Sequence, residues 1–526
     1  MAEREYIVSL NRGVNYDEFW EQIENASADD GFVPTRRVDI VNERPGSLRS
    51  CHYSLTDEEA NILRNDPRVF GVEIPPEQRD DISIGHDATQ ISDFTKTSSD
   101  TGDYVNWGLR RCMLENNPYT LGSNSLQTEF PYNLDGTGVD IVIQDSGIQA
   151  DHPDFNDVNG VSRVQQIDWY AASGLSGTMP TNHYTDYDGH GTHCAGIAAG
   201  KTYGWAKNAR IYSVKVDGLE GTSDPNGGIP ISDCFDVIKL WHRNKPVDPV
   251  TGFKRPTVVN MSWGYGGSRT SAFYGNYRGS SWSFNDSEIG SSNTALWNLK
   301  GIVPGLIIYG GRRIPVRVAS VDADVQEMID EGIHVCIAAG NSYYKIDVPG
   351  GVDYDNNAYF GIYTTDFVME YYHRGSSPYD DEAFIVGNVD SSLYADGKEQ
   401  KASSSCAGAG VDIYAPGTDI MSTCSTNTRF SSGVYPLDNS YKICNISGTS
   451  MASPQVVGVL AQVLSVHPSA TTQQAKDLIL SAATSDNMYN GTGDANYNDT
   501  RSIYGSTERF LFNLYNSSQQ FRISFD

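Results

Sequence analysis

The sequence predicts an α/β fold, in which a mainly parallel sheet carries helices on both faces and a small α+β domain precedes it. Residues 139–143, apart from Asp140, and residues 335–339 are short runs of β-branched and small apolar residues, typical of strands buried on both faces. Residues 456–464 are apolar apart from Gln462 and predict a buried helix. Strands and helices of this kind belong to a layered α/β core.

The small domain is predicted over residues 1–78. Phe19, Trp20 and Ile23 share one side of a predicted helix, and Thr56 begins the capping box Thr-Asp-Glu-Glu of a second helix. Strands are expected at 6–10, 38–41, 50–55 and 69–74, and the first helix at 16–23. The resulting order, βαββαβ, is that of a ferredoxin-like domain.

The remaining chain divides by composition. Residues 79–104 are polar without periodicity and predict an exposed linker, a preferred place for proteolytic nicking. Residues 105–490 form the expected main domain, interrupted by insertions at 266–320 and 342–380. Residues 491–526 are a polar and then aromatic extension, expected to pack on this domain or on a partner.

The charge and hydropathy of the chain exclude several classes. Its 526 residues carry a net charge of −28, which argues against binding to nucleic acid or to an anionic membrane. No apolar run reaches the roughly 18 residues that a transmembrane helix needs. The first residues lack the apolar core of a signal peptide, so we expect a removed signal, another export route or an intracellular protein.

The cysteines are too sparse for a disulfide scaffold, at eight in 526 residues. Cys194 and Cys336 fall in core-like stretches and are expected to be free thiols. Cys406, Cys424 and Cys444 lie close together in sequence, which allows a bridge among them.

The most informative stretch is Gly-Thr-Ser-Met-Ala-Ser-Pro at residues 448–454, directly ahead of the predicted buried helix. Ser450 would lie at the helix N-terminus, where unpaired backbone N–H groups stabilise negative charge on a reacting oxygen. A serine needs a base to become a nucleophile, and the base needs an orienting group. Taken alone, the stretch also fits an ordinary helix start.

Three further motifs supply the missing groups. Asp145 ends the strand that begins at residue 139 and is followed by Ser-Gly, and His190 lies in Asp-Gly-His-Gly-Thr-His-Cys-Ala-Gly. Asn341 ends the second buried strand. The order Asp, His, Ser along the chain is that of subtilisin. Together the four motifs resemble those of the subtilisin-like serine protease family, over roughly residues 104–490.

Two details refine the resemblance. Cys194 and the stretch Gly-Trp-Ala-Lys at 204–207 are similar to the proteinase K branch of the family. The N-terminal domain resembles the family's inhibitory propeptide, above all in Leu-Thr-Asp-Glu-Glu at 55–59 and Asp-Pro-Arg-Val at 66–69. The resemblance implies a propeptide sheet that packs on the enzyme, with the tail at 72–76 approaching the substrate pocket.

The resemblance implies a role for each motif. Ser450 would attack the scissile carbonyl, His190 would act as general base and then acid, and Asp145 would orient His190. Asn341 and a backbone N–H at Ser450 would bind the oxyanion. His193 is expected to be structural, and the chemistry requires no cofactor.

The substrate-binding residues are inferred in the same way. Ser262, Trp263 and Gly264 match the strand edge that pairs with an extended peptide, although Trp263 also fits plain core. Ala338, Ala339 and Gly340 match the facing pocket wall. Acidic groups of the second insertion, such as Asp347 or Asp353, would either reach a basic substrate residue or solvate a loop, and the latter is favoured.

A structural calcium ion is a further implication of the resemblance. Asp412, in Val-Asp-Ile-Tyr-Ala-Pro-Gly, matches a calcium-binding aspartate of proteinase K-like enzymes, with oxygen ligands expected near Asp381 and Ala383. Asp154 matches a ligand of a second site, whose loop is missing here.

These observations predict a serine endopeptidase that acts on proteins or peptides and is made as a self-processing zymogen with its own N-terminal domain as inhibitor. Two alternatives stay open. The chain could be a structural component of a larger assembly that keeps the fold, or a zymogen that remains latent.

Overall fold

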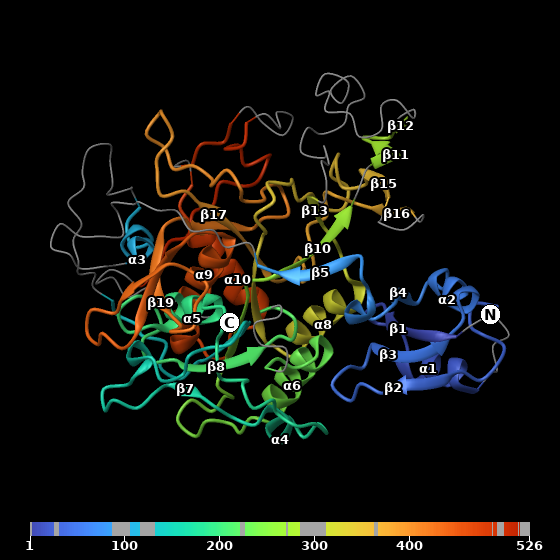
Figure 1. Cartoon of the computed structure of the whole chain (residues 1–526), viewed down its shortest axis with the longest axis horizontal. Coiled ribbons are helices and arrows are strands. Elements are labelled where there is room, and N and C mark those ends of the chain that lie inside the picture. The colour runs from blue at the N-terminus through green and yellow to red at the C-terminus, as the bar shows by residue number, and fades with distance from the viewer. Residues whose placement is uncertain are drawn as a thin grey trace.

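The computed structural model describes residues 3–25, 31–86, 106–115, 132–220, 227–269, 272–283, 312–361, 367–485, 488–491, 499–513 and 515. Most of the predicted linker (87–104), part of the first insertion (284–311) and the last eleven residues (516–526) lie outside these ranges. Figure 1 shows the arrangement of the described elements.

The N-terminal unit is a four-stranded antiparallel sheet covered by two helices. Its elements are β1 (Arg4–Leu10), α1 (Tyr16–Asn25), β2 (Asp39–Asn42), β3 (Ser50–Leu55), α2 (Asp57–Arg64) and β4 (Val69–Glu73), with strand order β2-β3-β1-β4. Phe19 and Ile23 of α1 are buried in a core of the unit's own. Thr56 and Glu59 form the expected capping box of α2. The βαββαβ order is as predicted.

The main body is built on a seven-stranded parallel sheet of order β18-β17-β14-β9-β6-β8-β7, which confirms the predicted α/β fold. In chain order the strands are β6 (Asp140–Asp145), β7 (Val164–Gln165), β8 (Arg210–Lys215), β9 (Thr257–Met261), β14 (His334–Ala338), β17 (Phe384–Val389) and β18 (Ile413–Pro416). All residues of β6, β9 and β17 are buried, as strands covered on both faces require.

Two pairs of helices accompany the sheet. Helices α5 (His190–Ala199) and α9 (Thr449–Val466) pack on each other, and α9 contacts β9, β14 and β17. Helices α6 (Ile231–Asn244) and α8 (Ala319–Asp330) form the second pair, on the side of the N-terminal sheet in Figure 1. Among the described residues α9 alone has the length and hydropathy of a membrane span, and 89% of it is buried within the protein.

The shorter elements complete the body. They are the 3-10 helices η1 (Pro76–Gln78) and η2 (Pro153–Phe155), the helices α3 (Trp107–Arg111), α4 (Trp169–Ser173) and α10 (Thr472–Ala482), and the antiparallel strands β19 (Ile420–Cys424), β20 (Ser432–Val434) and β21 (Lys442–Ile446). Arg509 and Leu511 of the C-terminal extension form backbone hydrogen bonds with Tyr414 of β18. The described part of the extension therefore packs on the main body.

The two insertions join each other in space. Strands β11 (Ala272–Tyr277) and β12 (Ser280–Ser283) of the first insertion pair with β15 (Asn357–Gly361) and β16 (Phe367–Glu370) of the second, in the order β12-β11-β15-β16. Figure 1 shows this sheet at the edge of the molecule, beyond β13 (Arg312–Pro315). Sequence patterning did not reveal this pairing because the strands lie far apart in the chain.

One predicted boundary needs correction. Residues 82–85, placed in the exposed linker, form strand β5 (Ile82–Gly85), which pairs antiparallel with β10 (Gly264–Arg269) in the sheet β13-β10-β5. Ile82 is buried. The tail that lies beside the Ser262–Gly264 edge is therefore this strand and not residues 72–76, which end β4 and lead into η1.

The N-terminal unit docks on α6 and α8 through buried charges. Arg44 lies 2.9 Å from Asp236 of α6 and 2.8 Å from Asp324 of α8, with only 2% of its side chain exposed. The Glu73 carboxylate accepts hydrogen bonds from the backbone N–H groups of Ala319 and Ser320 at the start of α8. A carboxylate at this end of a helix is electrostatically favourable.

Buried neutral histidines make the stability of this fold sensitive to acid. Burial lowers the pKa of five histidines to about 3 or about 4: His183, His193, His242, His334 and His373. In the unfolded chain each would titrate near pH 6.5. Below that pH the unfolded state binds more protons than the folded state, so stability is lost as pH falls. Burial also raises the pKa of Glu220 to about 7 and of Asp322 to about 6, which offsets part of this effect.

We predict that the urea concentration at the unfolding midpoint decreases as the pH is lowered from 6.5 to 5. His334→Gln should flatten this dependence by about one proton, because burial alone depresses the pKa of His334. Urea titrations at half-unit pH intervals measure both effects. A midpoint that stays constant over this range would contradict the prediction.

Candidate active site

The end of β6 and the start of α5 bring Asp145 and His190 together. His190 Nδ1 lies 2.8 Å from Asp145 Oδ1, and both side chains are fully buried. The same carboxylate oxygen accepts a hydrogen bond from Ser146 N. Gly191 packs so closely that a side-chain carbon there would lie 2.1 Å from Gly147 O. The glycine after His190 is therefore required for α5 to approach the strand end.

The pair is polarised toward a charged imidazole. Burial disfavours the protonated form of His190, but the Asp145 carboxylate outweighs burial and raises the pKa of His190 well above its ordinary value. Asp145 thus stabilises the imidazolium that forms when His190 accepts a proton.

Ser450 lies in the first turn of α9 and lines a pocket. Its Oγ donates to the Ser262 carbonyl oxygen at 3.1 Å. His190 Nε2 has no hydrogen-bond partner among the described residues, so the serine and the histidine are not bonded to each other in this structure. Such bonds often form only once substrate is bound.

Pro454 explains how the serine is held. Pro454 has no N–H, so it cannot donate to the carbonyl of Ser450 four residues earlier, as a helix would otherwise require. The free carbonyl oxygen instead accepts from Ser262 Oγ at 3.0 Å and from Cys194 Sγ at 3.3 Å. This helix irregularity therefore connects two other motifs, those of Ser262 and Cys194, to the serine.

Asn341 is oriented by Thr449. Its amide oxygen accepts from Thr449 N at 2.9 Å and from Thr449 Oγ1 at 3.1 Å, and Asn341 lines the pocket beside Ser450. Since the oxygen is engaged, the NH₂ group is the part of the amide left to face the pocket. This is the orientation that an oxyanion donor needs.

The pocket is walled by the residues expected to bind substrate. Those lining it include Ser262, Trp263, Gly264, Ala338, Ala339 and Gly340. Trp263 is only 3% exposed and also packs edge-to-face on Tyr265, so it belongs to both the core and the wall. Gly85 and His86 line the pocket as well, because β5 lies along its edge.

His86 was missed by sequence reasoning, which placed it in the linker. Its ring stacks on the ring of His190, with centroids 3.6 Å apart and an interplanar angle of 11°. The alternation of isoleucine with serine and glycine at 82–85 was the one available signal for a strand. Its partner edge could not be read from the chain.

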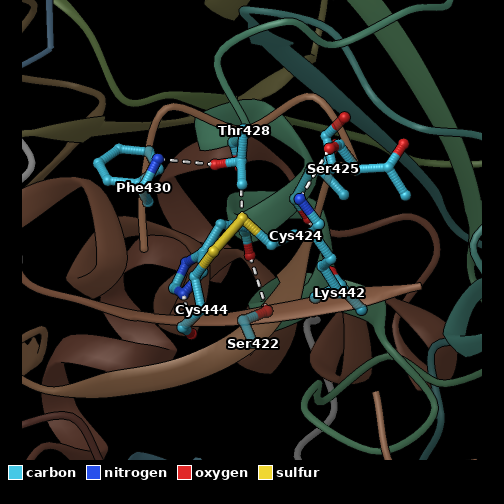
Figure 2. The surroundings of a disulfide bond; sticks show 12 residues. Ser422, Cys424, Ser425, Thr428, Phe430, Lys442 and Cys444 are labelled. Atoms are coloured by element: carbon cyan, nitrogen blue, oxygen red, sulfur yellow. Dashed lines mark hydrogen bonds between the residues drawn. A yellow bond between two sulfur atoms is a disulfide. The ribbon is translucent and has the colours of Figure 1, made fainter. Parts of the chain in front are cut away.

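A disulfide bridge lies next to Gly189, the residue that precedes His190. It joins Cys424 of β19 to Cys444 of β21, whereas Cys406 is a buried thiol outside the bridge. Figure 2 shows Thr428 and Phe430 beside the bridge. A side-chain carbon at Gly189, which has φ of +94°, would lie 3.1 Å from Cys424 Sγ. The bridge therefore packs directly under the residue that precedes His190.

His193 is structural, as expected. Its Nε2 lies 3.0 Å from the carbonyl oxygen of Ile420 and 3.1 Å from that of Cys444. These contacts bind α5 to β19 and β21 and leave His190 as the histidine of this motif that is bonded to Asp145.

The acidic groups of the second insertion do not face a substrate. Asp353 is buried and pairs with Arg278 at 2.7 Å and with Lys345 at 2.9 Å. Asp347 lies 3.3 Å from the same lysine. Asp353 joins the two insertions and Asp347 bonds within the second, so neither carboxylate solvates a loop or is available to a basic substrate residue.

The residues expected to bind calcium do not fit that ion. Lys476 Nζ lies 3.0 Å from Asp412 Oδ1 and donates to the carbonyl oxygens of Asp381 at 2.7 Å and Ala383 at 2.5 Å. The oxygens predicted as ligands thus surround an ammonium group of the chain itself. Asp412 is a partner of Lys476, which sequence reasoning missed because α10 follows so far along the chain.

Asp154, matched to a second calcium site, is also engaged otherwise. Its Oδ1 accepts from Thr202 N at 2.9 Å and from the Tyr435 hydroxyl at 3.1 Å.

One group in the described ranges has three metal-type ligand atoms within 4.8 Å of one another: His86, Asp145 and His190. The two imidazole rings are parallel, so their nitrogen lone pairs do not converge on one point. Asp145 Oδ1 is already bonded to His190 Nδ1. This group does not fit a metal centre.

Comparison with known proteins identifies relatives of the chain. The model of the subtilase family matches residues 136–506. Cerevisin of Saccharomyces cerevisiae is 26% identical over 95% of this chain and 66% of its own length. The subtilisin-like serine protease Pen c 2 of Penicillium citrinum is 27% identical over 69% of this chain and 61% of its own. The chain thus spans less than two thirds of the length of these curated relatives.

Solved structures give lower similarity. Fervidolysin from Fervidobacterium pennivorans is 18% identical with a TM-score of 0.49, covering 96% of this chain and 60% of that one. A cold-adapted subtilisin-like serine proteinase is 23% identical with a TM-score of 0.44, covering 78% of this chain and 98% of that one.

We predict that Lys476→Ser destabilises the protein by about 3 kcal/mol, because it leaves the Asp412 carboxylate without its cation. Millimolar calcium should recover part of the loss in this variant. In the same calcium, the thermal midpoint of the double variant Lys476→Ser/Asp412→Asn should stay below that of Lys476→Ser. Thermal unfolding with calcium or with a chelator measures both. Unchanged stability of Lys476→Ser would show that the ammonium contributes nothing at this position.

Proposed function

Because the chain belongs to the subtilase family, we propose that it is a serine endopeptidase with Ser450 as nucleophile, His190 as general base and Asp145 as orienting group. The observation that carries this proposal is the buried Asp145–His190 hydrogen bond next to a pocket that is lined by Ser450 and by His86, whose ring stacks on His190. Its relatives named as serine proteases support the same reaction class.

The proposed reaction uses groups already in place. Substrate binding would rotate Ser450 Oγ from the Ser262 carbonyl toward His190 Nε2, which has no other partner among the described residues. His190 would take the hydroxyl proton as the oxygen attacks the scissile carbonyl, and Asp145 would stabilise the imidazolium. The Asn341 amide and the backbone N–H of Ser450 would bind the developing oxyanion, and His190 would return the proton to the leaving amine.

Substrates would bind as an added strand. Strand β10 already pairs with β5 from Gly264 to Gly267, with Gly264 opposite Gly85 and Gly266 opposite Ser83. Backbone pairing of this type accepts any extended peptide and leaves side-chain selection to the pocket walls. The proposed substrates are therefore proteins or peptides in extended conformation.

The N-terminal unit would act as an inhibitor until it is removed. Its sheet is held on α6 and α8 by the Arg44 ion pairs and by Glu73, while β5 covers the pocket and His86 covers His190. Residues 1–86 thus cover the site in an extended, substrate-like manner. This arrangement supports a latent zymogen that is activated by cleavage after His86.

Ser450→Ala should abolish peptide hydrolysis while leaving the fold intact, with a loss of about 10⁶ in turnover, the size reported for the equivalent change in subtilisin. Asn341→Leu should lose about 10²–10³, since one of two oxyanion donors is removed. Hydrolysis of a fluorogenic peptide by the processed enzyme measures both, with circular dichroism as the folding control. Activity of Ser450→Ala within tenfold of the unsubstituted enzyme would refute the triad assignment.

Processing of the full chain should be intramolecular, because β5 is already in the pocket. The rate should be independent of protein concentration, the new N-terminus should lie between residues 87 and 104, and Ser450→Ala should stay full length. Mass spectrometry over time, at several concentrations, measures all three. An uncut chain that hydrolyses peptides at full rate would contradict the inhibitor role.

Residues 1–86, added separately, should inhibit the processed enzyme, since the unit has its own core. Arg44→Ala should weaken this inhibition about 30-fold or more, because it removes the buried cation that the N-terminal unit contributes and leaves Asp236 and Asp324 with Lys239 alone. The exposed Arg37 offers a matched control, whose change to alanine should leave the inhibition constant unaltered.

A further inference from the structure

The His86 side chain is held on three sides. Its ring face lies on His190, and its Nδ1 lies 3.2 Å from Arg429 Nη2. Its Nε2 lies 3.3 Å from Asp188 Oδ1, an electrostatic contact without hydrogen-bond geometry. Only 2% of the side chain is exposed. His86 follows Gly85, which pairs with Gly264, so it is placed there as part of an extended strand.

The two polar neighbours fit only one form of an imidazole. A guanidinium has donors and no acceptor, so Nδ1 of His86 must accept from Arg429. The proton then belongs on Nε2, which faces the Asp188 carboxylate, an acceptor. Asp188 and Arg429 are therefore complementary to a neutral histidine that carries its hydrogen on Nε2. A lysine or arginine in this place would meet the Arg429 charge, and a phenylalanine would stack without polar contacts.

The two neighbours are fixed by bonds that do not involve His86. Arg429 Nε donates to Asp188 Oδ2 at 2.6 Å, and Arg429 N donates to the Asp188 carbonyl at 3.0 Å. Thr428 Oγ1 donates to the same carbonyl at 3.0 Å. The bridge between Cys424 and Cys444 closes the loop that carries Thr428 and Arg429. Burial alone would raise the pKa of Asp188, but His86, His190 and Arg429 outweigh it and lower the pKa to about 2, so the carboxylate stays charged.

We propose that Asp188 and Arg429 form a subsite that selects histidine at the substrate position stacking on His190. The proposal rests on the proposed peptidase function and names a preference within it. In the full chain His86 occupies this subsite, so the same contacts that select a substrate also hold the tail of the N-terminal unit in the pocket.

The test uses the processed enzyme and quenched fluorescent peptides with the sequence of residues 82–91. The position of His86 is varied to Phe, Lys, Gln and Ala. We expect kcat/KM to be about tenfold higher for the histidine peptide than for the Phe, Lys or Ala peptides, with Gln between them, since an amide can both donate and accept. Equal values for histidine, phenylalanine and alanine would overturn the proposal.

Arg429→Met tests the subsite directly, because methionine keeps the length of the side chain and removes its donors. The histidine-to-phenylalanine ratio of kcat/KM should fall to within about twofold of one. The exposed Arg210 provides the matched control, and Arg210→Met should keep the full ratio. A ratio that survives Arg429→Met would show that the preference has another origin.

A second measurement uses the intact chain. In the Ser450→Ala background, ¹⁵N chemical shifts of the histidine rings should show His86 protonated on Nε2, and Arg429→Met should shift this signal. A charged ring or the opposite tautomer would contradict the proposed contacts.

The outcomes separate the two proposals. If no peptide of the series is cleaved, the peptidase function fails. If all are cleaved at the same rate, the peptidase function stands and the histidine subsite fails.

Discussion

The structure depends on one interaction that water does not reach, the hydrogen bond between Asp145 and His190. A buried carboxylate and imidazole persist only where surrounding groups hold both in register. The parallel sheet supplies the carboxylate at a strand end, α5 supplies the imidazole in its first turn, and Gly191 lets the two elements approach. Two residues connect the pair to α9 through the carbonyl of Ser450. Pro454 leaves this oxygen without its helical donor, and Cys194 donates to it. The pocket is a consequence of that register.

The sequence was sufficient for the parts of this arrangement that are local. Local composition predicted β6, β14 and α9, and the resemblance of four motifs to the subtilisin-like family implied that Asp145, His190, Asn341 and Ser450 belong to one site. The capping box at Thr56 is likewise a property of four consecutive residues. What failed was pairing between distant segments. Strand β5 has only four residues and acquires its identity from the β10 edge, Lys476 replaces an ion that the motif around Asp412 implied, and the choice of Cys424 and Cys444 over Cys406 required the antiparallel pairing of β19 with β21.

The additions to the core are linked to one another by buried charge. Arg44 joins the N-terminal sheet to two helices of the main body, and Asp353 joins the first insertion to the second. Ion pairs of this kind contribute little net stability relative to apolar packing, but breaking one is costly, so they favour a single arrangement over its alternatives. The acidic residues of the chain are therefore not all at the solvated surface, since several buried carboxylates connect separate segments.

Lys476 gives the protein a different relation to its surroundings than a bound ion would. A ligand that binds only the folded state stabilises it by mass action, so its contribution rises and falls with the free concentration. An ammonium at the end of a side chain is present at every dilution and cannot be competed away by another cation or sequestered by another protein. The Lys476 contact is therefore permanent, whereas the contribution of a bound ion would change with its concentration. Stability at the junction of α10 with β17 and β18 thus comes from the polypeptide itself and is independent of ion supply.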